Sequence, residues 1–268
     1  MPAFLQSSAF FLLLALSSSS FANALAYTDQ SFEGSLSVVP VPEGWVAEYQ
    51  QLWDVVVVGD GSTQGFLFSI GPDERPVEYL HAVVKEMNAT VLANKIKKTT
   101  IRGHEAAIID HFGIVHEKYV AIRKNDALLI IYGTTKRDPD SLQQHLEVIA
   151  SKAMLFPSAH PDHLAGNYFI DREEGLNGDA ELMPGLYKEK VSLNSNGVFG
   201  DLGIDEGGSR IGKDTVKAAY LLGTWVQRGS RLIIEENNHY FVNYRIQTTA
   251  NGLTLVDQDG VRTRWLRQ

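Results

Sequence analysis

The chain has 268 residues, a formal net charge of −8 and the apolar and charged fractions of an ordinary globular protein. The acidic balance and the lack of a basic block argue against a nucleic-acid partner. The absence of cysteine excludes disulfides, thiol chemistry and cysteine-based metal sites, so each folded part must bury enough apolar surface unaided.

The first residues have the pattern of a cleavable secretory signal. An apolar run over 9–16 precedes four serines and the small-residue site Ala22-Asn23-Ala24. This run is too short for a membrane span, which needs about 20 apolar residues, and no cysteine can carry a lipid anchor. We therefore expect a signal peptide over 1–24, a mature chain from Leu25 and a periplasmic or secreted location. A buried N-terminal helix is the alternative.

Residues 25–157 combine strand and helix patterns. Strands are predicted at 35–40, 55–58, 65–70, 96–101, 106–112, 115–122 and 128–133, with Pro40 ending the first of them. Apolar residues at three- and four-residue steps predict a helix from Pro76 to Val91, and Asp138 with Pro139 begins a second one that reaches Ala153. This order predicts an α+β domain in which two helices pack on an antiparallel sheet.

Short motifs in this part resemble the PsbP-like and DcrB-like domains. These are Ser37-Val38-Val39-Pro40, the following Pro42-Glu43-Gly44-Trp45, and strands around Arg102-Gly103-His104 between the two helices. The resemblance implies a non-catalytic domain that binds, stabilises or chaperones other proteins. It supplies no catalytic residue.

A polar joint at 158–163 separates this part from residues 164–268, which are predicted to be all-β. The hairpin-turn dipeptides Asn196-Gly197, Asn251-Gly252 and Asp259-Gly260 punctuate apolar runs, and no window predicts a long helix. Such spacing is typical of a small barrel or a sandwich, and the pattern leaves both open.

Two motifs of the second part are similar to those of lipocalin-like barrels. They are Leu164-Ala165-Gly166-Asn167-Tyr168 and Gly223-Thr224-Trp225, the latter followed by Gly229 and Leu232. Barrels of this kind either hold a small apolar ligand or are filled by their own side chains. If the barrel is hollow, we expect a pocket at Tyr168, Trp225, Phe241 and Tyr244.

Cofactor and metal patterns are incomplete. The segment 207–213 fits G-x-x-x-x-G-K, but Asp214 stands where a phosphate loop needs Ser or Thr. His160 and His163 flank Asp162 without a rigid third ligand. We predict no cofactor and no metal site.

Five residues on neighbouring predicted strands could carry acid–base chemistry: Glu105, Asp110, His111, His116 and Glu117. Consecutive strand residues point to opposite faces, which weakens an Asp110–His111 pair. There is also no G-x-S-x-G motif. These residues are interpreted as a polar sheet face, and no catalytic residue is predicted.

The sequence therefore favours an exported, non-catalytic binding or accessory protein of the bacterial cell envelope, which acts by recognising an unidentified envelope protein. One alternative is a carrier of a small apolar molecule in the C-terminal barrel. The other is a hydrolase whose catalytic groups converge from distant positions.

Overall fold

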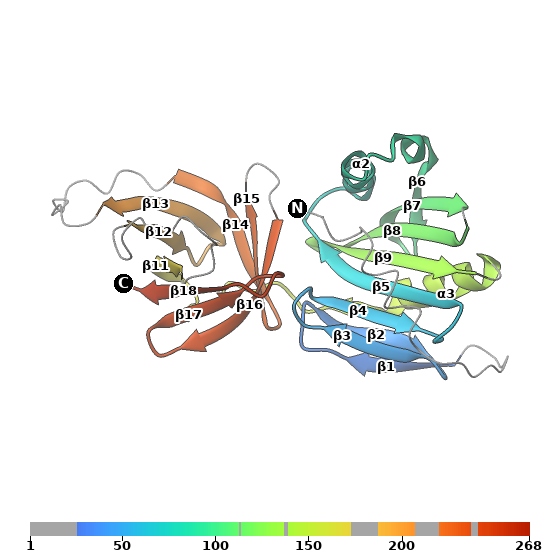
Figure 1. Cartoon of the computed structure of the whole chain (residues 1–268), viewed down its shortest axis with the longest axis horizontal. Helices are drawn as coiled ribbons and strands as arrows, with labels where there is room; N and C mark the ends of the chain where they lie inside the picture. Colours follow the sequence, from blue (N-terminus) through green and yellow to red (C-terminus); the bar gives the residue numbers. More distant parts are fainter. Residues whose placement is uncertain (1–25, 113, 137–138, 173–186, 207–219, 237–240) are drawn as a thin grey trace. The chain divides into compact units, whose positions relative to one another are not determined.

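The computed structural model describes residues 26–112, 114–136, 139–172, 187–206, 220–236 and 241–268. The predicted signal peptide and the glycine-rich segment 207–213 lie outside these residues. The chain divides into two compact units, Met1–Phe156 and Pro157–Gln268 (Figure 1). They are called the N-terminal unit and the C-terminal unit.

Within the described residues, the N-terminal unit holds a main sheet and a small sheet. The main sheet has the order β3-β4-β5-β9-β8-β7-β6 and is antiparallel throughout. Its strands are β3 (Val46–Gln50), β4 (Val55–Gly59), β5 (Gln64–Gly71), β6 (Ile96–Ile101), β7 (His104–Phe112), β8 (His116–Lys124) and β9 (Ala127–Thr135). The small sheet, of order β1-β2-β10, comprises β1 (Tyr27–Ser31), β2 (Leu36–Pro42) and β10 (Met154–Leu155).

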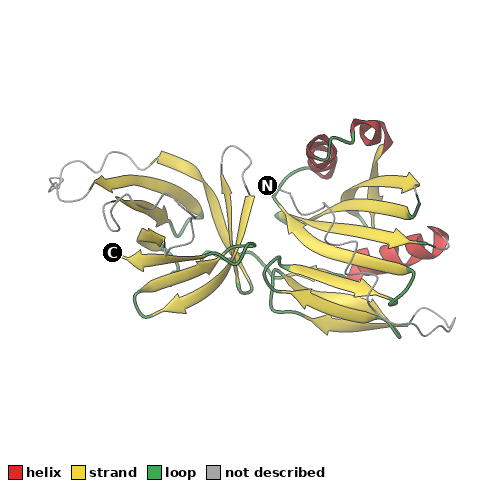
Figure 2. Ribbon diagram, in the orientation of Figure 1, coloured by secondary structure: helices red, strands yellow, loops and turns green. Residues whose placement is uncertain are grey.

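Two α-helices, α2 (Pro76–Glu86) and α3 (Pro139–Lys152), are drawn in red in Figure 2. Helix α2 begins at a proline, as predicted, but it ends before Val91. The backbone of Asn88 has φ +53°, which an α-helix cannot accommodate, and the chain continues as the 3₁₀ helix η2 (Thr90–Lys95). The predicted N-cap of α3, Asp138, lies outside the described residues.

The two helices cover opposite faces of the main sheet. Leu80 and Val84 of α2 pack in one core cluster with Tyr119 of β8. Gln143 of α3 instead accepts a hydrogen bond from Lys118. Since Lys118 and Tyr119 are neighbours on a strand, their side chains point to opposite sides of the sheet. The predicted α+β architecture, with two helices on an antiparallel sheet, is thereby confirmed.

One strand boundary differs from the prediction. Pro40 does not end the first predicted strand, because β2 continues to Pro42 and pairs Pro40 with Asp29 of β1. On the other side of β2, β10 pairs only with Leu36 and Val38. From Pro40 onward β2 thus has one open side, where a residue without a backbone N–H is tolerated.

The described part of the C-terminal unit is a closed antiparallel barrel. Of the two architectures that the sequence left open, the structure shows the barrel and not the sandwich. The strands pair in chain order, and the last one pairs back onto the first. They are β11 (Gly166–Arg172), β12 (Tyr187–Leu193), β13 (Val198–Glu206), β14 (Tyr220–Arg228), β15 (Arg231–Glu236), β16 (Phe241–Thr249), β17 (Gly252–Val256) and β18 (Arg262–Arg267). Two of the predicted turns, Asn196-Gly197 and Asp259-Gly260, connect β12 to β13 and β17 to β18.

Candidate functional site

The barrel interior is the first candidate site, and strand alternation determines which side chains enter it. Tyr168 of β11 and Trp225 of β14 belong to the buried core cluster, each with only 1% of its surface exposed. Trp225 pairs with Ile234, and Leu232 pairs with Tyr244, which packs against the same cluster. Tyr168, Trp225 and Tyr244 therefore face one interior.

The fourth predicted pocket residue lies elsewhere on the barrel wall. Phe241 is three positions before Tyr244 on β16. An odd separation along a strand directs two side chains to opposite faces. The structure thus brings together three of the four predicted residues and places Phe241 on the outer surface.

Two further aromatic residues, Phe199 and Trp265, belong to the same core cluster and were not among the four predicted pocket residues. The ring of Trp265 lies 5.8 Å from that of Tyr168 and stacks at 6.4 Å on that of Phe199. Their immediate neighbours, Val198 and Gly200 for Phe199 and Arg264 and Leu266 for Trp265, show no clear apolar–polar alternation that would reveal a buried face. Their rings fill part of the space that a ligand would need.

The polar groups of Tyr168 and Trp225 form hydrogen bonds with backbone carbonyls. The Tyr168 hydroxyl donates to the Leu164 carbonyl at 2.6 Å, and the Trp225 indole N–H donates to the Asn194 carbonyl at 2.8 Å. Burial raises the pKa of Tyr168, and the charge of Arg267 opposes that rise. These contacts fix the two rings as parts of the core.

The predicted joint contributes to this core. Ala159 exchanges both of its backbone hydrogen bonds with Gln227 of β14. The ring of His160 packs edge-on against Trp225, with 5.2 Å between the ring centres. Leu164 is fully buried. His160 thus acts as a packing residue, and the described residues contain no group of three or more acidic or histidine side chains arranged for a metal ion.

A second candidate site lies on the α3 face of the main sheet. His116 Nε2 lies 3.0 Å from Asp110 Oδ1, and Lys118 Nζ lies 3.3 Å from the same oxygen. Lys118 also donates to Gln143 of α3. Both basic side chains are almost fully buried, whereas the Asp110 carboxylate is one-third exposed. The network ties α3 to the sheet by charge-assisted hydrogen bonds.

The structure separates the other members of the predicted acid–base cluster from this network. Glu117 and His111 pair with each other across β7 and β8, one residue along from Asp110 and His116, and so point to the α2 face. Glu117 accepts a hydrogen bond from Tyr132 there at 2.9 Å. Glu105 forms an ion pair with Lys98.

A structural role for Asp110 is testable. Replacing Asp110 with Ala should lower the free energy of unfolding by about 2–3 kcal/mol, because the Lys118 charge stays buried without its carboxylate. Glu105→Ala, on the same strand, removes an exposed ion pair and should leave stability nearly unchanged. Urea unfolding followed by fluorescence measures both variants. Equal effects of the two substitutions would contradict this assignment.

A third cluster surrounds His145 of α3 and joins the small sheet to the main sheet. His145 Nδ1 lies 2.8 Å from the hydroxyl of Tyr27 in β1, and its ring lies 4.9 Å from that of Trp45. Trp45 in turn stacks on Phe66 of β5. Burial lowers the pKa of His145, with Asp60 opposing the shift, and burial raises the pKa of Tyr27 to about 12. The cluster holds β1 through an uncharged histidine.

This cluster predicts a pH-dependent stability. The pKa of His145 in the folded chain lies below its ordinary value of 6.5, so the unfolded chain takes up a proton first as the pH falls. The free energy of unfolding should therefore decrease below about pH 6.5, by at most about 1.4 kcal/mol per pH unit. His145→Gln should reduce this slope, and the exposed His81→Gln should not. Urea unfolding at pH 7.5, 6.5 and 5.5 gives the slopes, and identical slopes for both variants would refute the assignment.

The comparisons with known proteins include a match to a solved structure. No protein-family model and no curated protein matches the chain. The chain is similar to the solution structure of cyanobacterial PsbP (CyanoP) from Synechocystis sp. PCC 6803, with 13% identity and a TM-score of 0.37, over 53% of this chain and 99% of that one. That protein bears the family name of the sequence resemblance, but a match at this level does not show membership of the family. Across the described residues, no helix has the length and apolar character needed to span a membrane.

Proposed function

We propose that this chain is an exported, non-catalytic binding or accessory protein of the bacterial cell envelope that acts by recognising another protein. The proposal of export rests on the secretory pattern of residues 1–24. The proposal of protein recognition rests on the main sheet of the N-terminal unit.

The observation that carries protein recognition is the open main sheet. In the described part of the chain, its terminal strands β3 and β6 are each paired on one side only. An edge strand presents unpaired backbone N–H and C=O groups, and an extended segment of another protein can add to them as a further strand. The barrel of the C-terminal unit closes on itself and leaves no comparable edge in its described strands.

The fixed position of the acid–base residues supports a role without bond chemistry. Asp110 bonds to both His116 and Lys118, and Lys118 also donates to Gln143 of α3. His145 is packed between Tyr27 and Trp45. A general acid or base must reach a substrate proton, and these groups are instead engaged in holding the elements together.

Affinity capture tests this function. The chain from Leu25 onward, immobilised through a tag, is incubated with envelope extract of its own host, and an unrelated exported protein with the same tag serves as the control bait. We expect one protein, or a small set, to co-purify reproducibly with this chain alone and to cross-link to its N-terminal unit. If the eluates of the two baits are indistinguishable in repeated experiments, the proposal of a protein partner fails.

A second candidate function, the carriage of a small apolar molecule, is favoured by one feature of the barrel. Tyr244 and Ile246 face the interior but remain only partly buried, whereas their cross-strand neighbours Leu232 and Leu255 are fully buried. If this feature marks a pocket, native mass spectrometry of chain purified from its host should show a retained lipid-sized mass, and Tyr244→Ala should lose it. A spectrum with the mass of the bare chain, together with no binding of hydrophobic dyes, would rule out a carrier.

A further inference from the structure

The edge strand β6 carries an unusual local charge. Residues 95–102 read K-I-K-K-T-T-I-R and place four cations in eight positions of a chain whose net charge is −8. The cations are interleaved with apolar and hydroxyl residues, so they do not form a basic block in the sequence. Lys97 and Lys98 lie on the edge strand β6 itself, Lys95 directly precedes it at the end of η2, and Arg102 follows it in the turn to β7. Lys95, Lys97, Lys98 and Arg102 are all exposed.

The turn that follows β6 determines which backbone groups remain open. Arg102 and Gly103 form a two-residue hairpin turn with φ +50° and φ +86°, and Ile101 pairs with His104 across it. Residues that flank such a turn exchange both of their hydrogen bonds, and bonded pairs then alternate along the ladder. The backbone groups of Lys98 and Thr100 therefore point away from β7, toward the open edge.

No other element of the described chain takes up these groups. Strand β6 pairs with β7 alone, and the one further backbone hydrogen bond found for it among the described residues runs from the Ile96 N–H, at the start of the strand, to the Ala93 carbonyl. The opposite edge strand, β3, contains no lysine or arginine. The two edges of the main sheet are thus chemically different, and β6 is the basic one.

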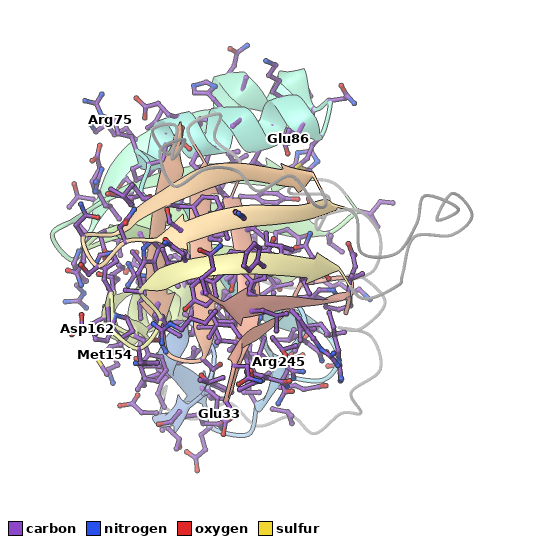
Figure 3. The ribbon with its side chains drawn as sticks, turned by 90° about the vertical axis from the view of Figure 1, so that its left-hand side faces the viewer. Glu33, Arg75, Glu86, Met154, Asp162 and Arg245 are labelled. Atoms are coloured by element: carbon purple, nitrogen blue, oxygen red, sulfur yellow. The ribbon has the colours of Figure 1, made fainter. Side chains whose placement is uncertain are left out.

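One carboxylate, that of Glu105 on β7, offsets part of the positive charge of β6. Lys98 Nζ lies 3.0 Å from the carboxylate of Glu105. The pKa of Glu105 is held below its ordinary value chiefly by the hydrogen bond from Lys98, with further contributions from the charges of Arg75 and Arg123. Figure 3 labels Arg75 at one end of α2 and Glu86 at the other. Among the described residues, Lys95, Lys97 and Arg102 form no ion pair.

We propose that the basic edge of β6 accepts an extended acidic segment of a partner protein as an additional strand. The backbone of the segment pairs with Lys98 and Thr100, and its carboxylates lie opposite the lysines, where cross-strand pairs of opposite charge are stabilising. A second copy of this chain is disfavoured at the same edge, because two rows of lysines would face each other. This inference rests on the proposed function and specifies its binding surface.

Peptide binding to the whole chain tests this surface. The probes are two fluorescein-labelled peptides of ten residues, one alternating valine with glutamate and the other alternating valine with lysine, and fluorescence anisotropy gives their dissociation constants. We expect the glutamate peptide to bind at least about tenfold more tightly than the lysine peptide. The affinity should fall as salt is raised, since the contacts are exposed and charged.

Two kinds of variant locate the peptide on the chain. Lys97→Glu/Lys98→Glu reverses the charge of the edge, and Thr100→Pro removes a backbone N–H that points outward and leaves the β7 ladder intact. Each should weaken binding of the glutamate peptide about tenfold. Lys85→Glu/Lys136→Glu changes the net charge equally at exposed lysines elsewhere and should stay within about twofold. Lys97→Gln/Lys98→Gln serves as a milder variant, and thermal unfolding checks that every variant is folded.

Several outcomes would overturn the inference. If the glutamate and lysine peptides bind equally well, the inference of an acidic partner is wrong. If the folded variants of β6 bind the glutamate peptide as tightly as the unchanged chain does, the peptide binds at another surface. If the partner found by affinity capture still binds Lys97→Glu/Lys98→Glu, the proposed function stands and β6 is not its surface. If no partner is captured at all, the proposed function fails whatever the peptides do.

Discussion

Backbone hydrogen bonding at the margins of β-sheets is the constraint on which both units depend. A strand with no neighbour leaves its N–H and C=O groups to water or to another chain. The C-terminal unit meets this constraint by closure, since β18 pairs back onto β11. The main sheet of the N-terminal unit does not close. Its terminal strands β3 and β6 stay open, and its described surface therefore retains sites for strand addition.

Packing alone must hold each unit together, because the chain has no cysteine. In the N-terminal unit the main sheet is covered on both faces, by α2 through apolar contacts and by α3 through contacts that include a buried polar network. In the C-terminal unit the aromatic rings of Tyr168, Trp225 and Trp265 fill part of the interior. In the N-terminal unit, His116, Lys118 and His145 are buried polar groups that form hydrogen bonds within the fold.

Local patterns predicted much of the fold. Both α-helices were predicted, α2 from the spacing of apolar residues between Pro76 and Met87 and α3 from the proline at its first position, Pro139. These signals act within a few residues of the chain. The dipeptides Asn196-Gly197 and Asp259-Gly260 correctly predicted hairpin turns, because turn formation also depends on adjacent residues. The end of β2 at Pro40 was predicted wrongly, since tolerance of a proline depends on whether a neighbouring strand needs its N–H, and that neighbour is β10, more than a hundred residues away in the chain.

The sequence by itself determined the absence of disulfides and the two fold classes, because composition and short-range periodicity specify these properties. Only the tertiary structure decided that the C-terminal strands close into a barrel, that Phe241 faces away from Tyr244, and that Asp110 meets His116 and Lys118. It alone placed Lys97 and Lys98 on an edge strand of the main sheet, with Lys95 and Arg102 directly beside that strand. The physical reason is register: which residues face each other across a sheet depends on pairing between distant segments, and a shift of one position reverses every side chain.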